Sequence, residues 1–128
     1  MIEIMISIHP QWCSLILDLN KRWELRKTCP KSANLPYRCY IYQTNGGGVV
    51  GEFICDSIEE IRPDEINRKS LKDTFVEPAD AEYYANGKIL YKWRIRSLIA
   101  YSEPKDLSQF GLEKPPQSWC YIKESRAD

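Results

Sequence analysis

The chain has 128 residues, of which 43% are hydrophobic and 28% charged, and its 18 basic residues balance 18 acidic ones. This composition excludes a disordered tail, a collagen-like fibre and a coiled coil. The length is typical of one domain, so we expect a single domain over residues 1–128 that buries a core without a disulfide or metal. The zero net charge excludes a uniformly basic nucleic-acid coat protein but is compatible with a local basic patch.

Membrane and metal signals are weak throughout the sequence. No apolar run reaches the roughly 18–20 residues that a membrane helix needs, and the short, alternating apolar start does not resemble a signal peptide. Five cysteines occur without a Cys-x-x-Cys pair, and His9 is the only histidine. This pattern favours reduced thiols in a cytoplasmic protein. We therefore expect no membrane contact, no metal site and no cofactor, and the sequence leaves the oligomeric state open.

The chain begins with a strand followed by a helix. Apolar and polar residues alternate over Ile2–Ile8, and this period of two predicts a strand. Pro10 favours a first helical turn, and the spacing of apolar residues predicts a short amphipathic helix over residues 11–19. Residues 21–27 then alternate again and predict a second strand.

The rest of the chain predicts further strands and two short helices. Expected strands, rich in aromatic and β-branched residues, cover residues 37–44, 49–58, 89–102 and 119–122. The Asn-Gly-Gly-Gly run at residues 45–48 predicts a hairpin turn, and segment 89–102 is long enough for two strands joined by a bend. Short helices are expected over residues 62–70 and 78–86. The sequence thus predicts an α+β, mainly β fold, in which five to six mostly antiparallel strands curl into a barrel with two or three short flanking helices.

Charge is strongly segregated along the sequence. Residues 21–38 contain six basic residues and one acidic residue, whereas residues 51–65 contain six acidic residues and one basic residue. Aromatic residues lie among the basic ones, including Trp12 and Trp23. Such a combination favours a ligand with phosphates and unpaired bases, since cations bind phosphate and rings stack on bases. The alternative is that the rings lie in the core and the charges on a solvated strand face.

Three motifs carry a family resemblance: Ile-Ser-Ile-His-Pro at residues 6–10, Lys21-x-x-Glu24-x-Arg26, and Pro-Pro-Gln-Ser-Trp-Cys-Tyr at residues 115–121. Together they resemble the ASCH domain, a member of the PUA-like superfamily. The resemblance implies a PUA-like β-barrel with a cleft between the barrel and a flanking helix, lined by the Lys, Glu and Arg of the motif. It also implies RNA or nucleotide binding.

The motif suggests roles for individual side chains. Lys21 and Arg26 are expected to hold phosphate or a polar base edge, and Glu24 to accept hydrogen bonds from a donor group. The other candidate ligand-binding residues are Lys27, His9, Trp12 and Trp23. The alternative for the motif is an exposed ion-pair ladder.

Two other classes of function stay open. Some small ASCH proteins are amidohydrolases acting on N4-acetylcytidine, and others have been proposed as ribonucleases; Lys21 and Glu24 would be the catalytic residues here. Glu24 occupies the position of the nucleophilic threonine of those amidohydrolases, which weakens that assignment because a carboxylate lacks the hydroxyl. The further alternative is a protein-interaction module that uses the acidic segment 51–65 to mimic nucleic acid.

Overall fold

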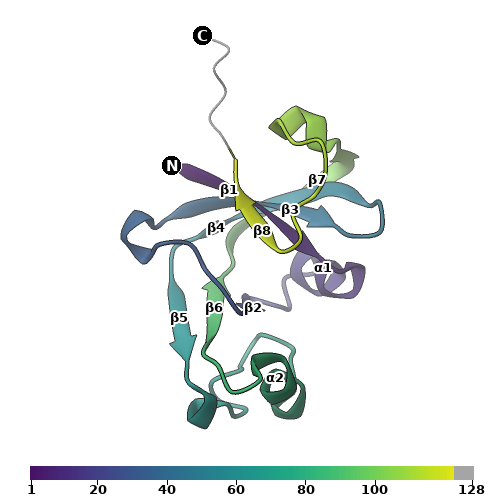
Figure 1. Ribbon diagram of the computed structural model, residues 1–128. Coiled ribbons are helices and arrows are strands. Elements are labelled where there is room, and N and C mark those ends of the chain that lie inside the picture. Colours follow the sequence, from purple (N-terminus) through teal and green to yellow (C-terminus); the bar gives the residue numbers. More distant parts are fainter. Residues whose placement is uncertain (123–128) are drawn as a thin grey trace.

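The computed structural model describes residues 1–122, which form eight strands and two α-helices (Figure 1). The strands are β1 Ile2–Ile8, β2 Trp23–Arg26, β3 Tyr37–Gln43, β4 Gly48–Cys55, β5 Ile58–Ile61, β6 Leu90–Arg94, β7 Arg96–Lys105 and β8 Trp119–Tyr121. The helices are α1 Pro10–Leu17 and α2 Pro78–Ala85. Within this described range, no helix is long and apolar enough to span a membrane.

The strands form two separate sheets. The first has the order β7-β4-β3-β1-β8 and the second the order β2-β6-β5. All pairs are antiparallel except β1 with β3, which run parallel from the pairing of Ile2 with Tyr37 onward. In Figure 1 the five-stranded sheet lies above the smaller sheet, α2 lies beside the far end of the smaller sheet, and α1 lies at one side. The α+β, mainly β fold class predicted from the sequence is confirmed.

Two details differ from the predicted barrel. The expected strand over residues 49–58 divides into β4 and β5, and the segment 89–102 divides into β6 and β7. In both cases the chain passes from one sheet to the other at the division, so the described residues hold eight strands rather than five to six, and the two sheets do not close into one barrel. The hydrophobic pattern did not reveal the divisions because each half remains strand-like in composition.

The helix expected over residues 62–70 is wrong. Only a short 3₁₀ turn, Pro63–Glu65, forms there. The Asn67 side chain accepts a hydrogen bond from the Ser70 backbone, and the Ser70 hydroxyl accepts one from the Asn67 backbone. Such local side-chain bonds compete with helix formation, which explains the irregular turn. The helix over residues 78–86 is confirmed as α2, and its end at Asn86 has the left-handed backbone typical of a helix C-terminus.

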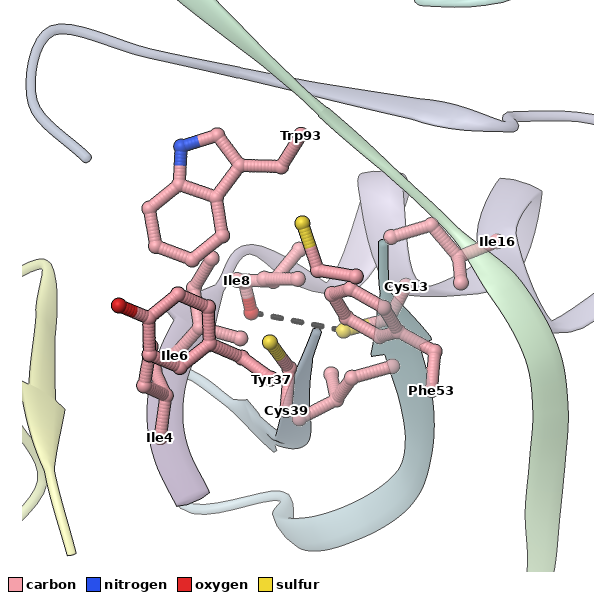
Figure 2. Packing of buried hydrophobic residues seen from close by; sticks show 11 residues of the cluster. Ile4, Ile6, Ile8, Cys13, Ile16, Tyr37, Cys39, Phe53 and Trp93 are labelled. Atoms are coloured by element: carbon pink, nitrogen blue, oxygen red, sulfur yellow. Dashed lines mark hydrogen bonds between the residues drawn. The ribbon is translucent and has the colours of Figure 1, made fainter. Parts of the chain in front are cut away.

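The main core lies between the five-stranded sheet, α1 and one residue of the second sheet (Figure 2). Its buried residues are Ile4, Ile6, Ile8, Cys13, Ile16, Tyr37, Cys39, Ile41, Phe53, Cys55 and Trp93. Trp93 comes from β6 and therefore joins the two sheets. Its indole N–H donates to the Thr28 carbonyl at 3.2 Å. Its ring packs edge-on against that of Trp119, with the two ring centres 5.6 Å apart.

A second, smaller core lies under α2. Its buried residues are Leu25, Ile61, Leu71, Ala81, Ala85 and Leu90. Leu25 packs into this cluster from β2, while its neighbours Glu24 and Arg26 point to the opposite face, as alternation along a strand requires. Strand β2 therefore separates an apolar cluster from a polar one.

Candidate functional site

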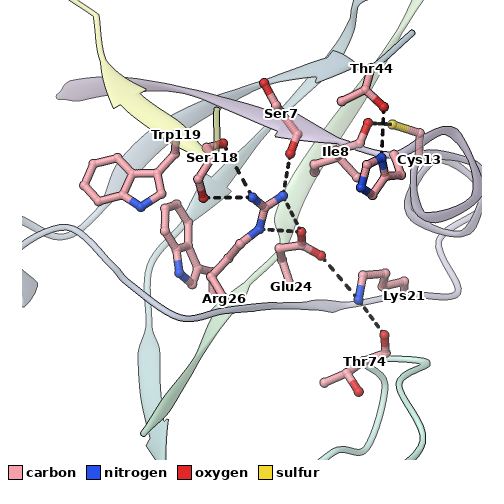
Figure 3. A network of polar contacts seen from close by, with 12 residues as sticks. Ser7, Ile8, Cys13, Lys21, Glu24, Arg26, Thr44, Thr74, Ser118 and Trp119 are labelled. Atoms are coloured by element: carbon pink, nitrogen blue, oxygen red, sulfur yellow. Dashed lines mark hydrogen bonds and ion pairs between the residues drawn. The ribbon is translucent and has the colours of Figure 1, made fainter. Parts of the chain in front are cut away.

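The motif residues Lys21, Glu24 and Arg26 form one buried network of ion pairs (Figure 3). Lys21 Nζ lies 3.3 Å from Glu24 Oε1, and Arg26 Nε donates to Glu24 Oε2 at 2.8 Å. The side chains are only 1%, 6% and 12% exposed, in the order Lys21, Glu24, Arg26. The structure therefore excludes the alternative of an exposed ion-pair ladder on a strand surface.

Arg26 connects β2 to two other parts of the fold. Its Nη2 donates to the Ser7 carbonyl of β1 at 2.6 Å, and its Nη1 donates to the Ser118 hydroxyl at 3.1 Å. The Ser7 hydroxyl in turn donates to the Pro116 carbonyl at 2.7 Å. Most donors of the guanidinium are thus engaged within the protein, so Arg26 acts first as a cross-link that fixes Glu24.

Lys21 is held from three sides. Its ammonium donates to the Thr74 carbonyl and pairs with Glu24, and it lies 5.0 Å from the ring centre of Trp12. Burial lowers the pKa of Lys21 below its usual value, and the Glu24 carboxylate opposes this shift by favouring the charged form. The residue predicted to bind a phosphate directly is therefore satisfied by groups of the protein.

A cleft of about 320 Å³ opens above this network. Its lining residues come from β1, α1, β2, α2 and four connecting segments: Ser7, His9, Trp12, Glu24, Leu25, Arg26, Thr44, Val76, Asp80, Tyr84 and Gln117. A cavity of this size that combines aromatic and aliphatic walls with convergent polar groups is suited to a small molecule. Four of the residues predicted from the sequence line it: His9, Trp12, Glu24 and Arg26.

His9 lies at the exposed rim of the cleft. Its Nδ1 is 3.1 Å from the Thr44 hydroxyl, a contact made possible by the parallel pairing of β1 with β3. The hydrogen bond from the Thr44 backbone N–H to the Ile8 carbonyl holds the two segments together at this point. This arrangement orients the imidazole of His9 at the entrance.

Trp23 and Lys27 do not line the cleft. Trp23 lies on the other face of β2, with the ammonium of Lys92 at 4.7 Å and the guanidinium of Arg94 at 6.0 Å from its ring centre. Lys27 is exposed and lies 4.7 Å from the ring centre of Tyr84, so it contacts the cleft wall from outside. The structure places Trp12 and Trp23 in different cavities, because alternation along β2 sends Trp23 away from Glu24.

Strand pairing brings together charges that the sequence separates. Arg38 lies 3.6 Å from Glu52, Lys92 3.4 Å from Glu59, and Arg96 2.8 Å from Asp56. Three acids of segment 51–65 thus neutralise bases of β3, β6 and β7. The charges that are segregated along the sequence are therefore partly paired in the fold.

Other cleft residues gave no clear signal in the sequence. Asp80 and Tyr84 stand four residues apart on α2, so they share a helix face, but nothing in the sequence placed that face against β2. Thr44 and Gln117 lie in loops whose positions depend on the sheet topology. Among residues 1–122, no group of three or more histidine, cysteine, aspartate or glutamate side chains is arranged to hold a metal ion.

Comparison with solved structures decides the fold. The ASCH protein of Zymomonas mobilis superimposes with a TM-score of 0.77 over 95% of this chain and 88% of its own, at 21% sequence identity. Its serine-to-alanine and tyrosine-to-phenylalanine variants superimpose with TM-scores of 0.79 and 0.78, again at 21% identity. The chain has the ASCH-domain fold. The cleft above Glu24 lies in this ASCH fold between α1, β2 and α2.

Comparison with protein sequences finds a relative of another kind. The large ribosomal subunit protein uL22 of Ureaplasma parvum serovar 3, in two strains, is 32% identical over 123 residues. The match covers 94% of this chain but only 39% of the length of those relatives. No family model matches the sequence.

Proposed function

We propose that the cleft binds a nucleoside unit of RNA or of a free nucleotide. The observation that carries the proposal is the combination in one cleft of about 320 Å³ of aromatic side chains with a buried carboxylate–guanidinium pair. Aromatic rings suit the face of a base, and a fixed carboxylate and guanidinium suit its polar edge.

The aromatic walls are Trp12 of α1 and Tyr84 of α2. Each ring is held in place by a lysine: Lys21 lies 5.0 Å from the Trp12 centre and Lys27 4.7 Å from the Tyr84 centre. Cations over the rings restrain them without filling the cleft. Either ring is therefore positioned before a ligand arrives, which reduces the entropy lost on binding.

The polar floor is also fixed in advance. Both oxygens of Glu24 already contact cations, and Arg26 is tied to Ser7 and Ser118. A carboxylate oxygen can accept more than one hydrogen bond, so Glu24 can still accept from an amino group or a ribose hydroxyl. The network orients this acceptor before a ligand arrives.

The charge of the lining favours a nucleoside part over a phosphate at this point. Arg26 is opposed by Glu24 and by Asp80, both of which line the cleft. A phosphate placed here would meet these carboxylates, whereas an uncharged base would not. The curated relatives, named as ribosomal subunit proteins, support RNA as the source of the nucleoside.

Calorimetric titration of the protein with cytidine, uridine, adenosine and guanosine tests the proposal, and a short RNA of mixed sequence serves as a further ligand. Trp12→Leu should weaken nucleoside binding by roughly tenfold, the loss of about one stacking contact. The matched control is Trp23→Leu, which removes a ring on the other face of β2 and should leave nucleoside binding unchanged. Absence of binding to all four nucleosides and to the RNA would refute the proposal.

Hydrolysis of RNA or of a modified nucleoside is a second candidate, favoured by the position of His9. The imidazole stands at the cleft rim, oriented by Thr44, where it can exchange protons with a bound ligand. Lys21, with its lowered pKa, is the second candidate proton carrier, but its ammonium is enclosed by Glu24 and Thr74. Product formation from RNA or acylated nucleosides that is lost in His9→Gln, with nucleoside binding retained, would establish this activity.

A further inference from the structure

A second cavity, of about 370 Å³, opens on the other side of the buried network. We call it the arginine groove, and its lining residues are Ile16, Leu19, Lys21, Arg22, Trp23, Asp73, Arg94, Ile95, Arg96, Ser97 and Leu98. It combines the guanidinium groups of Arg22, Arg94 and Arg96 with the ring of Trp23. None of these three arginines lines the cleft.

The arginine groove differs from the cleft in charge. Arg22, Arg94 and Arg96 line it, and Asp73 is its only acidic lining residue. Arg96 is paired with Asp56, but within residues 1–122 neither Arg22 nor Arg94 forms an ion pair with a carboxylate. Guanidinium groups without a carboxylate partner, beside an aromatic ring, are suited to phosphate.

The two cavities have no lining residue in common, but the same segments of the chain contribute to both. Helix α1 contributes Trp12 to the cleft and Ile16 to the arginine groove, and the segment before α2 contributes Val76 to the cleft and Asp73 to the groove. The cleft and the groove are therefore neighbouring parts of one seam between α1 and this segment.

The contact that divides the seam is the hydrogen bond from the Lys21 ammonium to the Thr74 carbonyl, shown in Figure 3. On one side of it the lining carries Glu24 and Asp80, which disfavour phosphate. On the other side it carries Arg22 and Arg94, which favour it. The cleft therefore suits a base, and the arginine groove suits the negatively charged phosphates of a nucleic-acid backbone.

We propose that the arginine groove binds the phosphodiester backbone next to the nucleoside in the cleft, so that the ligand is a single strand of nucleic acid rather than a free nucleoside. This inference rests on the proposed function and extends it to a second site. A single strand fits because its bases are free to enter a cavity, whereas a duplex would first have to release one. Trp23 offers a ring beside the arginines for a second base.

The test compares a nucleoside with a strand. The wild-type protein and Arg22→Gln/Arg94→Gln are titrated with the nucleosides and with fluorescein-labelled ten-nucleotide RNA and DNA of mixed sequence at several salt concentrations. The double variant should bind the RNA roughly tenfold more weakly, and its plot of log affinity against log salt should lose a slope of about 0.7 per arginine. Nucleoside binding should be unchanged. Comparison of RNA with DNA shows which backbone the groove accepts.

Arg62→Gln/Arg68→Gln is the matched control, since it removes the same charge from exposed positions that line neither cavity. Equal loss in both double variants would overturn the inference, because only net charge would then matter. Unchanged strand binding in Arg22→Gln/Arg94→Gln would also overturn it while leaving nucleoside binding in the cleft intact. In another outcome, the wild-type protein binds no nucleoside and Arg22→Gln/Arg94→Gln alone loses strand binding. That result would support backbone binding in the arginine groove and refute nucleoside binding in the cleft. Binding of neither nucleosides nor strands would refute both.

Discussion

Lys21 and Glu24 stand three residues apart and form an ion pair of 3.3 Å whose two side chains are almost completely buried. Arg26 completes the group from the same strand face, at 2.8 Å from the other carboxylate oxygen. Buried charges are stable only when paired and hydrogen-bonded, and each of these three has both. The motif is thus first an internal structure, and its Glu24 and Arg26 supply a fixed polar floor to the cleft.

Removing the central charge should be costly. Glu24→Gln leaves the ammonium of Lys21 and the guanidinium of Arg26 without their carboxylate in a buried place. We expect the free energy of unfolding to fall by about 3 kcal/mol, as measured by urea denaturation.

The matched control for that measurement is Glu77→Gln. Glu77 also pairs with a cation, Arg68, at 3.7 Å, but both side chains are exposed, at 69% and 85%. Exposed pairs contribute little, so this change should cost less than about 1 kcal/mol. Similar costs for the two variants would contradict the structural role assigned to Glu24.

Alkaline pH should destabilise the fold through buried thiols. Burial raises the pKa of Cys13 from 9.0 to about 12, and the neighbouring Glu24 carboxylate adds to the rise. Between these two values the unfolded chain loses the thiol proton while the folded chain keeps it. Stability from this group is therefore complete below pH 9 and is lost as pH rises toward 12.

Urea denaturation at several pH values from 8 to 11 measures this loss, with Cys13→Ala set against Cys120→Ala. The Cys13→Ala variant should lose stability less steeply with pH than the wild type, because that thiol no longer titrates. Cys120 is only partly buried, so its replacement should keep most of the slope. Equal slopes in the wild type and Cys13→Ala would show that Cys13 is not the group responsible.

Much of the fold follows from local patterns. The alternation of Ile2–Ile8 gives β1, and the Asn-Gly run gives the turn between β3 and β4. The points where the chain crosses from one sheet to the other do not follow from local patterns. They depend on contacts between residues far apart in sequence, such as the hydrogen bond from the Ile95 backbone N–H to the Arg22 carbonyl. The polar composition of segment 62–70 and its Pro63 predict a helix. That composition does not reveal the hydrogen bonds between Asn67 and Ser70 that form a turn instead.

The candidate site could be predicted in part. The motif spacing places Glu24 and Arg26 on one face of β2, and in the structure the Arg26 guanidinium donates a hydrogen bond to the Glu24 carboxylate. Burial of Lys21 could not be foreseen, since a lysine at a strand end is usually exposed. The contribution of Asp80 and Tyr84 from α2 depends on how that helix packs against Leu25, a long-range contact without a local signal.

The join between the two sheets gives a further prediction. The Trp119 indole donates to the Thr28 hydroxyl at 2.9 Å, and Trp93 donates to the carbonyl of the same residue. Thr28→Val removes only the hydroxyl acceptor, so the free energy of unfolding should fall by about 1 kcal/mol in urea denaturation. Thr28→Ser keeps the hydroxyl and should be close to the wild type; an equal loss in both would rule out the hydrogen bond as the cause.

The most direct test of the central claim is a titration of the isotope-labelled protein with the four nucleosides, followed by amide and indole NMR shifts. If the cleft binds a nucleoside, shifts should concentrate on the Trp12 indole and on the backbone of Glu24, Arg26 and Tyr84. The Trp23 indole, on the other face of β2, should change little. Shifts confined to the acidic segment 51–65, or no shifts at high nucleoside concentration, would contradict nucleoside binding in the cleft.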